Sequence, residues 1–355
     1  MDEYIELLCR LISIPSFSRE EGPVADALEE WMKDRGMKVS RTGNNIWLRS
    51  WEDPSSADFG MEPSRVILLN AHLDTVRPSS GYTMDPFTPS VREGKVYGLG
   101  SNDDGGSLVA LLAAYRKLIR KRQPYGLVFC ASAEEEVCGK DGIESVLPLL
   151  GRIDFGIIGE PTCMDMAVAE RGLMVLDCTA RGKSGHAARE EGENAIYKAI
   201  RDIDIIRSFS FEDVSPFLGP VKMTVTQIEA GTQHNVIPDT CRFVVDVRSN
   251  GLYSNVEILE TIQESLGCEV IARSTRLNSS SIPMEHPAVR RGQDLGLRAF
   301  GSPTTSNQAV ISGFPTLKIG PGDSSRSHTA DEFILIDEVS DGTEIYVKLL
   351  DDLII

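Results

Sequence analysis

Residues 98–131 read GLGSNDDGGSLVALLAAYRKLIRKRQPYGLVFCA, and this stretch decides the fold class. Its glycine-rich start leads into a helix expected over 107–121, and the apolar run at 126–131 is typical of a buried strand. Similar short apolar runs occur before it at 66–69 and after it at 155–158. Strand, crossover helix and strand in this order predict an α/β fold with a mainly parallel sheet and helices on both of its faces.

The second half of the chain has a different pattern. Strands are expected at 173–179 and 269–272, and between them a helix, two alternating strands and another helix follow in turn. This βαββαβ order predicts an inserted ferredoxin-like α+β domain. We therefore expect a discontinuous first domain, 1–174 and 284–355, and an inserted second domain, 175–283.

The chain is acidic. Its 355 residues include 36 Lys and Arg against 53 Asp and Glu, which gives a formal net charge of −17. Repulsion from phosphate groups disfavours nucleic acids and anionic membranes, so neither is expected as a partner. The apolar fraction of 41% is ordinary for a globular protein and argues against a largely disordered chain.

The cysteines and the N-terminal residues indicate a compartment. The seven cysteines form no C-x-x-C pair, which argues against both a disulfide framework and a cysteine zinc site. The opening MDEYIELLCRLISIP lacks the basic start and the cleavage site of a secretory signal. The longest apolar run, 108–115, is shorter than the roughly 18 residues of a membrane span. A cytoplasmic protein is therefore expected.

Acidic and imidazole side chains follow each strand of the expected parallel sheet. The carboxyl ends of such strands meet at one edge, where α/β proteins bind their ligands. The side chains delivered to this edge, including those of the glycine-rich turn, are His72, Asp74, Asp103, Asp104, Glu134, Glu135, Glu136 and Glu160. So many like charges in one place are costly unless cations lie among them. The sequence therefore predicts a metal site.

Each of these motifs also has a structural interpretation when it is taken alone. His72 can cap a strand beside a solvated Asp74, the acidic run 134–136 can begin a helix, and Glu160 can lie in a surface turn. Their joint occurrence favours the metal site. Residues two apart in an extended segment point to the same side, so the Asp74 carboxylate is expected to accept a hydrogen bond from His72.

The ligand types narrow the choice of metal. Imidazole and carboxylate ligands without thiolates fit zinc, cobalt or manganese in an open catalytic site. Two adjacent metals need a bridging carboxylate. Asp103, which lies among glycines at the start of the expected helix, is the natural bridge.

Eight motifs together carry a resemblance to a known family. The chain resembles, essentially from end to end, the dinuclear zinc amidohydrolases that include acetylornithine deacetylase, succinyl-diaminopimelate desuccinylase, aminoacylase and the glutamate carboxypeptidases. The motifs are HLDTV (72–76), GLGSNDDGG (98–106), AEEEVCGKDG (133–142), GEPT (159–162), GKSGHAA (182–188), HNVIPD (234–239), VDVR (245–248) and GPGDSSRSHTADE (320–332).

The resemblance implies a role for each candidate residue in the first domain, which becomes the zinc-binding catalytic domain. His72 would bind one zinc ion, Asp103 would bridge both, and Glu136 would be a further metal ligand. Glu160 would be the carboxylate ligand on one zinc ion and His328 the imidazole ligand on the other. The general base would be Glu135, with Glu134 as the alternative if the acidic run is shifted by one residue. Asp74 would orient His72. Cobalt or manganese can substitute for the two zinc ions.

The resemblance also implies roles in the inserted domain, which would act as a lid and join two chains into a homodimer. His186 would reach the active site of the neighbouring subunit and help to hold the oxyanion, and Asn235 would contact the substrate.

Arg171 and Arg248 can clamp a substrate carboxylate, although ordinary structural ion pairs explain them equally well.

The expected activity is hydrolysis of the N-acyl amide of an amino acid, a small-molecule substrate. The family usually has Lys where this chain has Gly105, and the overall pattern looks closest to deacylases of N-acetyl- or N-succinyl-ornithine, which act in arginine biosynthesis. Alternatives within the family are a succinyl-diaminopimelate desuccinylase and a di- or tripeptidase. A non-catalytic metal-binding scaffold and a metallophosphatase or nuclease are more remote alternatives.

Overall fold

The computed structural model describes residues 2–189 and 191–355. The chain divides into two compact units. The first comprises Met1–Val168, Ser281–Phe300 and Ser306–Ile355, and the second comprises Ala169–Ser280 and Gly301–Thr305.

The bounds of the second unit differ from the expected 175–283. The unit begins earlier, and it takes in 301–305, which we had expected in the first domain. The reason is local hydrogen bonding to Arg171. Its N–H donates to the carbonyl of Ser302 at 3.2 Å, and Thr305 Oγ1 donates to its carbonyl at 3.1 Å.

The first unit is built around a mixed, mostly parallel sheet in the order β1-β2-β6-β3-β7-β17-β8-β15, with β16 beside β8. Its centre is parallel and buried: β3 (Val66–His72), β6 (Gly126–Ser132), β7 (Phe155–Ile158) and β17 (Thr316–Lys318). The antiparallel β2 and β8 flank this centre. The outer strands are β1 (Ser40–Thr42), β2 (Asn45–Arg49), β8 (Met166–Glu170), β15 (Ser280–Ser281) and β16 (Ala299–Ser302). The predicted parallel sheet is confirmed.

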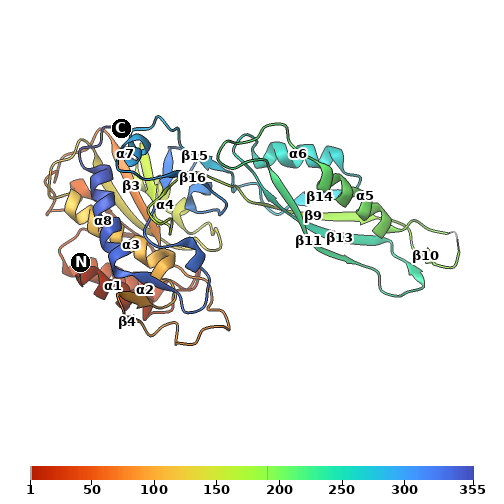
Figure 1. Ribbon diagram of the computed structural model, residues 1–355, viewed down its shortest axis with the longest axis horizontal. Helices are drawn as coiled ribbons and strands as arrows, with labels where there is room; N and C mark the ends of the chain where they lie inside the picture. The colour runs from red at the N-terminus through yellow and green to blue at the C-terminus, as the bar shows by residue number, and fades with distance from the viewer. Residues whose placement is uncertain (1, 190) are drawn as a thin grey trace. The chain divides into compact units, whose positions relative to one another are not determined.

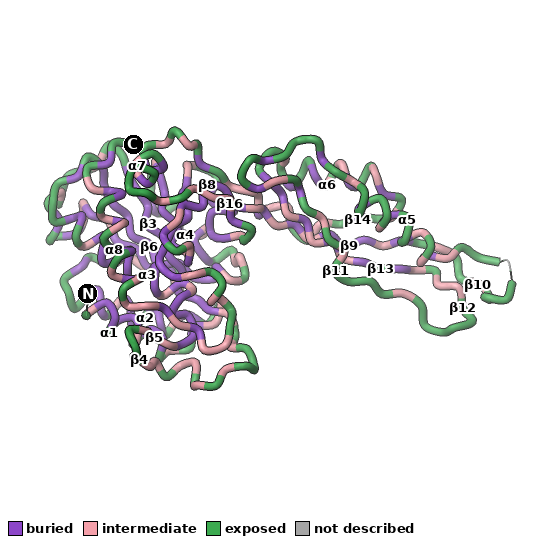
Figure 2. Tube along the Cα trace, in the orientation of Figure 1, coloured by how far each residue is buried: buried purple, intermediate pink, exposed green. Residues whose placement is uncertain are grey.

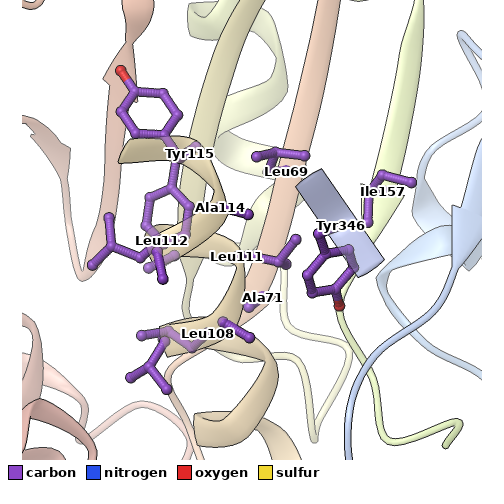
Figure 3. Packing of buried hydrophobic residues seen from close by; sticks show 14 of the residues in the cluster. Leu69, Ala71, Leu108, Leu111, Leu112, Ala114, Tyr115, Ile157 and Tyr346 are labelled. Carbon is purple, nitrogen blue, oxygen red and sulfur yellow. The ribbon is translucent and has the colours of Figure 1, made fainter. Parts of the chain in front are cut away.

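Helices cover both faces of this sheet, as predicted. On one face α3 (Gly106–Leu118) and α8 (Ile336–Leu350) lie side by side (Figure 1). Side chains of α3 pack against β3 and β7, with Tyr346 of α8 beside them (Figure 3). The same face also carries α1 (Asp2–Ile12), α2 (Gly22–Asp34) and α7 (Pro287–Asp294).

The opposite face of the sheet is covered by α4 (Ile143–Leu150), whose Ile143, Val146 and Leu150 contact the alternate residues of the strands. The central strands are therefore buried from both sides (Figure 2). None of the helices in the described chain is long and apolar enough to cross a membrane.

The second unit has the predicted ferredoxin-like topology. Its elements are β9 (Met174–Arg181), α5 (Ala195–Ser208), β11 (Lys222–Ala230), β13 (Thr240–Arg248), α6 (Asn255–Ser265) and β14 (Glu269–Ala272). The strands form an antiparallel sheet in the order β11-β13-β9-β14. Both helices pack on one face of it. A separate two-stranded ribbon joins β10 (Gly185–His186) to β12 (Val236–Ile237).

A small antiparallel sheet brings two distant segments of the first unit together. It has the order β18-β5-β4, with β4 (Ser90–Arg92), β5 (Lys95–Tyr97) and β18 (Phe333–Leu335). The pairing of β5 with β18 places the glycine-rich loop beside the C-terminal segment that carries His328. The remaining short helical turns are η1 (Ser50–Glu52), η2 (Ser101–Gly105), η3 (Asn307–Val310) and η4 (Ser324–Arg326).

Candidate metal centre

The first unit gathers the predicted ligands at the carboxyl ends of its parallel strands. His72 ends β3, Glu135 and Glu136 follow β6, Glu160 follows β7, and Asp103 lies just before α3. Ligand atoms of His72, Asp103 and Glu136 lie within 4.8 Å of one another, and so do those of His72, Glu135 and Glu160.

His72 is held at both ring nitrogens. Its Nε2 lies 3.1 Å from Asp103 Oδ1, and its Nδ1 lies 2.8 Å from the backbone carbonyl of Asp74. Because a carbonyl only accepts, Nδ1 carries a proton, and loss of the second proton from Nε2 would leave a lone pair there that can face a metal. Burial works against a charged ring, yet the negative charges of Asp103 and Asp74 outweigh it and raise the pKa of His72 well above its usual value.

Asp74 does not act on His72 in the predicted way. Its carboxylate Oδ1 lies 3.6 Å from His72 Nδ1, too far for a hydrogen bond, because the backbone carbonyl of Asp74 already takes the proton. The carboxylate instead accepts the N–H groups of Glu135 at 2.9 Å and Glu136 at 3.1 Å. Asp74 therefore anchors the loop that carries both glutamates.

Asp103 lies between the two histidines. Its Oδ1 is 3.1 Å from His72 Nε2, and its Oδ2 is 3.7 Å from His328 Nε2. Burial would raise the pKa of Asp103, but the hydrogen bond from His72 lowers it below its usual range. One carboxylate thus faces an imidazole with each of its oxygens, which is the placement that a bridging ligand requires.

His328 approaches from the C-terminal segment. Its Nε2 lies 3.0 and 3.1 Å from the two carboxylate oxygens of Glu136. This hydrogen bond raises the pKa of His328 to about 9. Glu136, His328 and Asp103 Oδ2 therefore form a second group of candidate ligands beside that of His72.

The carboxylates of Glu135 and Glu160 are strongly perturbed. Burial, together with the charges of Glu136, Asp74 and Asp103, raises the pKa of Glu135 to about 8 against the opposing effect of His72. Burial and the charges of Glu135 and Asp103 raise the pKa of Glu160 well above its usual value. These carboxyl groups are too close to ionise together without added positive charge, so the donor set fits divalent cations.

Glu135, not Glu134, lies in the cluster. Glu134 has a φ of +56° and its side chain lies 3.9 Å from Arg19. Burial and the charges of Asp141 and Glu21 raise its pKa. The structure therefore supports the placement of Glu135 beside His72 and Glu160.

Two residues of this centre have no counterpart in the sequence prediction. Glu21 is fully buried and accepts the N–H of Glu134 at 3.1 Å and the Asn44 amide at 3.0 Å. Ser18 donates its hydroxyl to Asp74 Oδ2 at 2.7 Å. Both lie near the start of α2, where no motif marks them, and only the path of the loops brings them to the site.

The candidate arginines belong to the second unit and are described within it alone. Arg248 forms a two-point ion pair with Asp246, at 2.9 and 3.1 Å. Arg171 donates to the carbonyls of Pro220 at 2.9 Å and of Leu218. The contacts of Arg248 agree with the expected alternative of a structural ion pair, whereas those of Arg171 are hydrogen bonds to backbone carbonyls. A role of either side chain in holding the substrate stays a prediction.

His186 lies in the two-stranded ribbon of the second unit, and Asn235 lies just before the second strand of that ribbon. The N–H of Ala187 donates to the carbonyl of Asn235 at 3.0 Å. His186 Nδ1 accepts the N–H of Ala188 at 3.1 Å, so in the neutral ring the proton lies on Nε2. The exposed His186 is therefore set up as an Nε2–H donor. Its action on the active site stays a prediction.

The family follows from a comparison of the sequence with known proteins. The model of peptidase family M20/M25/M40 matches residues 68–352. The chain belongs to this family. It is therefore a metal-dependent hydrolase, and the non-catalytic scaffold is not supported.

Two similar curated proteins carry the same activity in their names. A succinyl-diaminopimelate desuccinylase of Cereibacter sphaeroides (strain ATCC 17029 / ATH 2.4.9) is 26% identical and covers 98% of both chains. One of Stenotrophomonas maltophilia (strain R551-3) is also 26% identical and covers 100% of both. The expected closeness to acetylornithine deacylases is not what these relatives show.

Solved structures of other proteins are similar to this chain in fold. Aminopeptidase PepT of Bacillus cereus has a TM-score of 0.76 at 19% identity and covers 99% of this chain and 98% of its own. A dinuclear metal-binding M20 peptidase of Bacillus subtilis has a TM-score of 0.73 at 16% identity, with 98% and 97% covered.

Proposed function

We propose that this protein hydrolyses the N-acyl amide of an amino acid, with two zinc ions as cofactors and Glu135 as general base. The observation that carries the proposal is the placement of Glu135. Its side chain is nearly buried, lies 3.9 Å from His72 Nε2 and shares a cluster with Glu160. The position between the two histidines is taken by Asp103, so Glu135 is not required there. A buried carboxylate beside candidate metal ligands can then act in proton transfer.

The ligands divide into two sets. His72 and Glu160 would hold one ion and Glu136 and His328 the other, with Asp103 shared. The ions would acidify the attacking water and polarise the acyl carbonyl. Their charge also favours the ionised form of Glu135, which removes a proton from the water and then returns it to the leaving amine. Zinc, cobalt and manganese all suit these ligands.

The comparisons narrow the candidate substrates to a small group of amides. The names of the curated relatives favour N-succinyl-diaminopimelate over the N-acetyl- or N-succinyl-ornithine expected from the sequence. The similar solved structures include an aminopeptidase and a tripeptidase, so short peptides are the second candidate class.

A substrate panel tests this function. Purified protein loaded with zinc is given N-succinyl-diaminopimelate, N-succinyl-ornithine, N-acetyl-ornithine, a dipeptide and a tripeptide, and kcat/KM is measured for each. We expect the highest value for N-succinyl-diaminopimelate, loss of activity with a chelator and recovery on addition of metal. Hydrolysis of none of these amides in the metal-loaded protein would contradict the proposal.

We also propose a homodimer formed through the second unit. Its edge strand β11 is largely exposed, and no strand of the described chain pairs with its outer side. Ile228 of β11 is 56% exposed, and Tyr197 of the nearby α5 is 67% exposed. An unpaired strand edge with exposed apolar side chains on it and nearby favours association with a second copy. In such a dimer His186 would hold the oxyanion in the partner's site.

Mixing of inactive variants tests the shared site. Glu135→Ala and His186→Ala chains are each expected to be inactive, because one lacks the base and the other lacks the oxyanion donor. After subunit exchange, some sites would combine an intact Glu135 with an intact His186, so activity is expected to return. Each variant mixed with itself is the control. No recovery in a mixture shown by mass analysis to contain mixed dimers would rule out the shared site.

A further inference from the structure

Glu332 is a buried carboxylate that the proposed reaction does not use. It is 2% exposed and lies four residues after His328, at the point where the chain enters β18. Its Oε1 accepts the N–H groups of Asn102 at 2.8 Å and Asp103 at 2.9 Å, and its Oε2 accepts that of Gly100 at 3.0 Å. One side chain therefore holds three backbone positions of the glycine-rich loop.

Backbone pairing brings Glu332 to this loop. Phe333 pairs with Tyr97 in the small sheet, and the N–H of Gly98 donates to the carbonyl of Glu332 at 3.0 Å. The side chain of Asn102 strengthens the same junction from the other direction. It donates to the carbonyl of Asp323 and accepts the N–H of Asp323, both at 3.1 Å. The loop of Asp103 and the segment of His328 are thus joined at several points.

The chemistry of this junction requires a carboxylate. An ionised carboxylate only accepts hydrogen bonds, so both oxygens of Glu332 can face N–H groups. A glutamine has one oxygen, and its NH₂ group would face an N–H donor on one side. Burial and the charge of Asp103 raise the pKa of Glu332, and the three charge-assisted hydrogen bonds from the loop act in the opposite direction.

We propose that Glu332 is a positioning residue that fixes the backbone of Asp103, so that the two carboxylate oxygens of Asp103 face the two metal positions. Asp103 Oδ1 and Oδ2 face His72 and His328 respectively, and a small rotation of the loop would withdraw one of them. Glu332 lies outside both groups of candidate ligands found in the described chain, and it acts through Asp103. The inference rests on the proposed metal-dependent hydrolysis.

The test compares Glu332→Gln with a matched neighbour. Asp331 also accepts three hydrogen bonds, from the N–H and hydroxyl of Thr83 and from the N–H of Met84, but these belong to a different loop. Asp331→Asn is therefore the control for a general loosening of the C-terminal segment. Glu332→Ala is added to show how much of the effect comes from loss of the whole side chain.

The first measurement uses metal-free protein. Amide hydrogen exchange is followed by mass spectrometry for the peptide that contains residues 100–103. We expect faster exchange there in Glu332→Gln than in the wild type, and wild-type exchange in Asp331→Asn, because only the first variant removes an acceptor from these N–H groups. Equal exchange in the wild type and in Glu332→Gln would overturn the proposal.

The second measurement is a calorimetric titration with zinc or cobalt, which needs no substrate. Loss of a residue that orients a metal ligand weakens binding by about 10- to 100-fold. We expect this loss in Glu332→Gln and near wild-type affinity in Asp331→Asn. In a separate assay with substrate, we expect kcat of Glu332→Gln to fall by more than any change in KM. Wild-type affinity in Glu332→Gln, or equal weakening in both variants, would overturn the proposal. Failure of the proposed amide hydrolysis would appear only in the substrate panel and would leave this titration unchanged.

Discussion

Glu135→Gln is expected to lower kcat by about 10²- to 10⁴-fold, the usual contribution of a general acid–base group. Glutamine has nearly the shape of glutamate but cannot take a proton from water at neutral pH. The backbone of residue 135 is held by Asp74 through its N–H, so the substitution leaves the loop in place. Metal content is expected to stay near the wild-type value, because Glu136 and Glu160 are unchanged. Stopped-assay kinetics and metal analysis of the same preparation check both statements.

Glu134→Gln is the matched control for this variant. Glu134 is the neighbouring residue, is also nearly buried and lies outside both groups of candidate ligands found in the described chain. Its variant is expected to keep turnover close to that of the wild type. If Glu134→Gln loses activity and Glu135→Gln keeps it, the base has been assigned to the wrong residue of the acidic run.

The grouping of the site residues at the strand ends was predictable, because a parallel sheet brings the carboxyl ends of its strands to one edge whatever the details of its loops. His72, Glu135 and Glu160 follow three neighbouring strands, so the pattern of apolar runs was enough to expect them together. His328 lies far along the chain, and no spacing relates it to Asp103. It was found only through the family resemblance.

The contacts that hold the loops of the metal centre in place could not be predicted from the sequence, because they join side chains to backbone N–H groups. Asp74 was expected to hold His72 through its carboxylate, whereas it holds residues 135 and 136. Glu21 accepts the N–H of Glu134 in the same loop, and Glu332 accepts N–H groups of the glycine-rich loop. The path of a loop decides which N–H groups point inward, and hydrophobic periodicity carries no information about it.

Domain bounds and substrate were harder to predict for different reasons. The short return of 301–305 to the second unit depends on hydrogen bonds to Arg171 and has no compositional signal. The choice between succinyl-diaminopimelate and acetylated ornithine depends on a few contacts with the acyl group and the side chain. The metal motifs, which dominate the resemblance, are common to all these activities.

Asp103→Asn is expected to abolish turnover and to weaken metal binding at both positions. The two carboxylate oxygens of Asp103 face His72 and His328, at 3.1 and 3.7 Å. An asparagine keeps one oxygen and turns an NH₂ group, which cannot bind a metal, toward the other position. It also removes a negative charge that favours cations in the cluster. After dialysis against metal-free buffer, metal analysis is expected to show less than one ion per chain.

Asp104→Asn separates this effect from general damage to the glycine-rich loop. Asp104 is the next residue, is equally short and is buried, and its Oδ2 accepts the N–H of His72 at 3.3 Å. Burial raises the pKa of Asp104 to about 7, so near neutral pH a neutral amide replaces a group that is already partly protonated. Metal content and turnover are expected to stay within a few-fold of the wild type. If Asp103→Asn retains two ions and near-normal turnover, the bridge lies elsewhere. If both variants lose metal equally, the integrity of the loop, and not the shared carboxylate, controls binding.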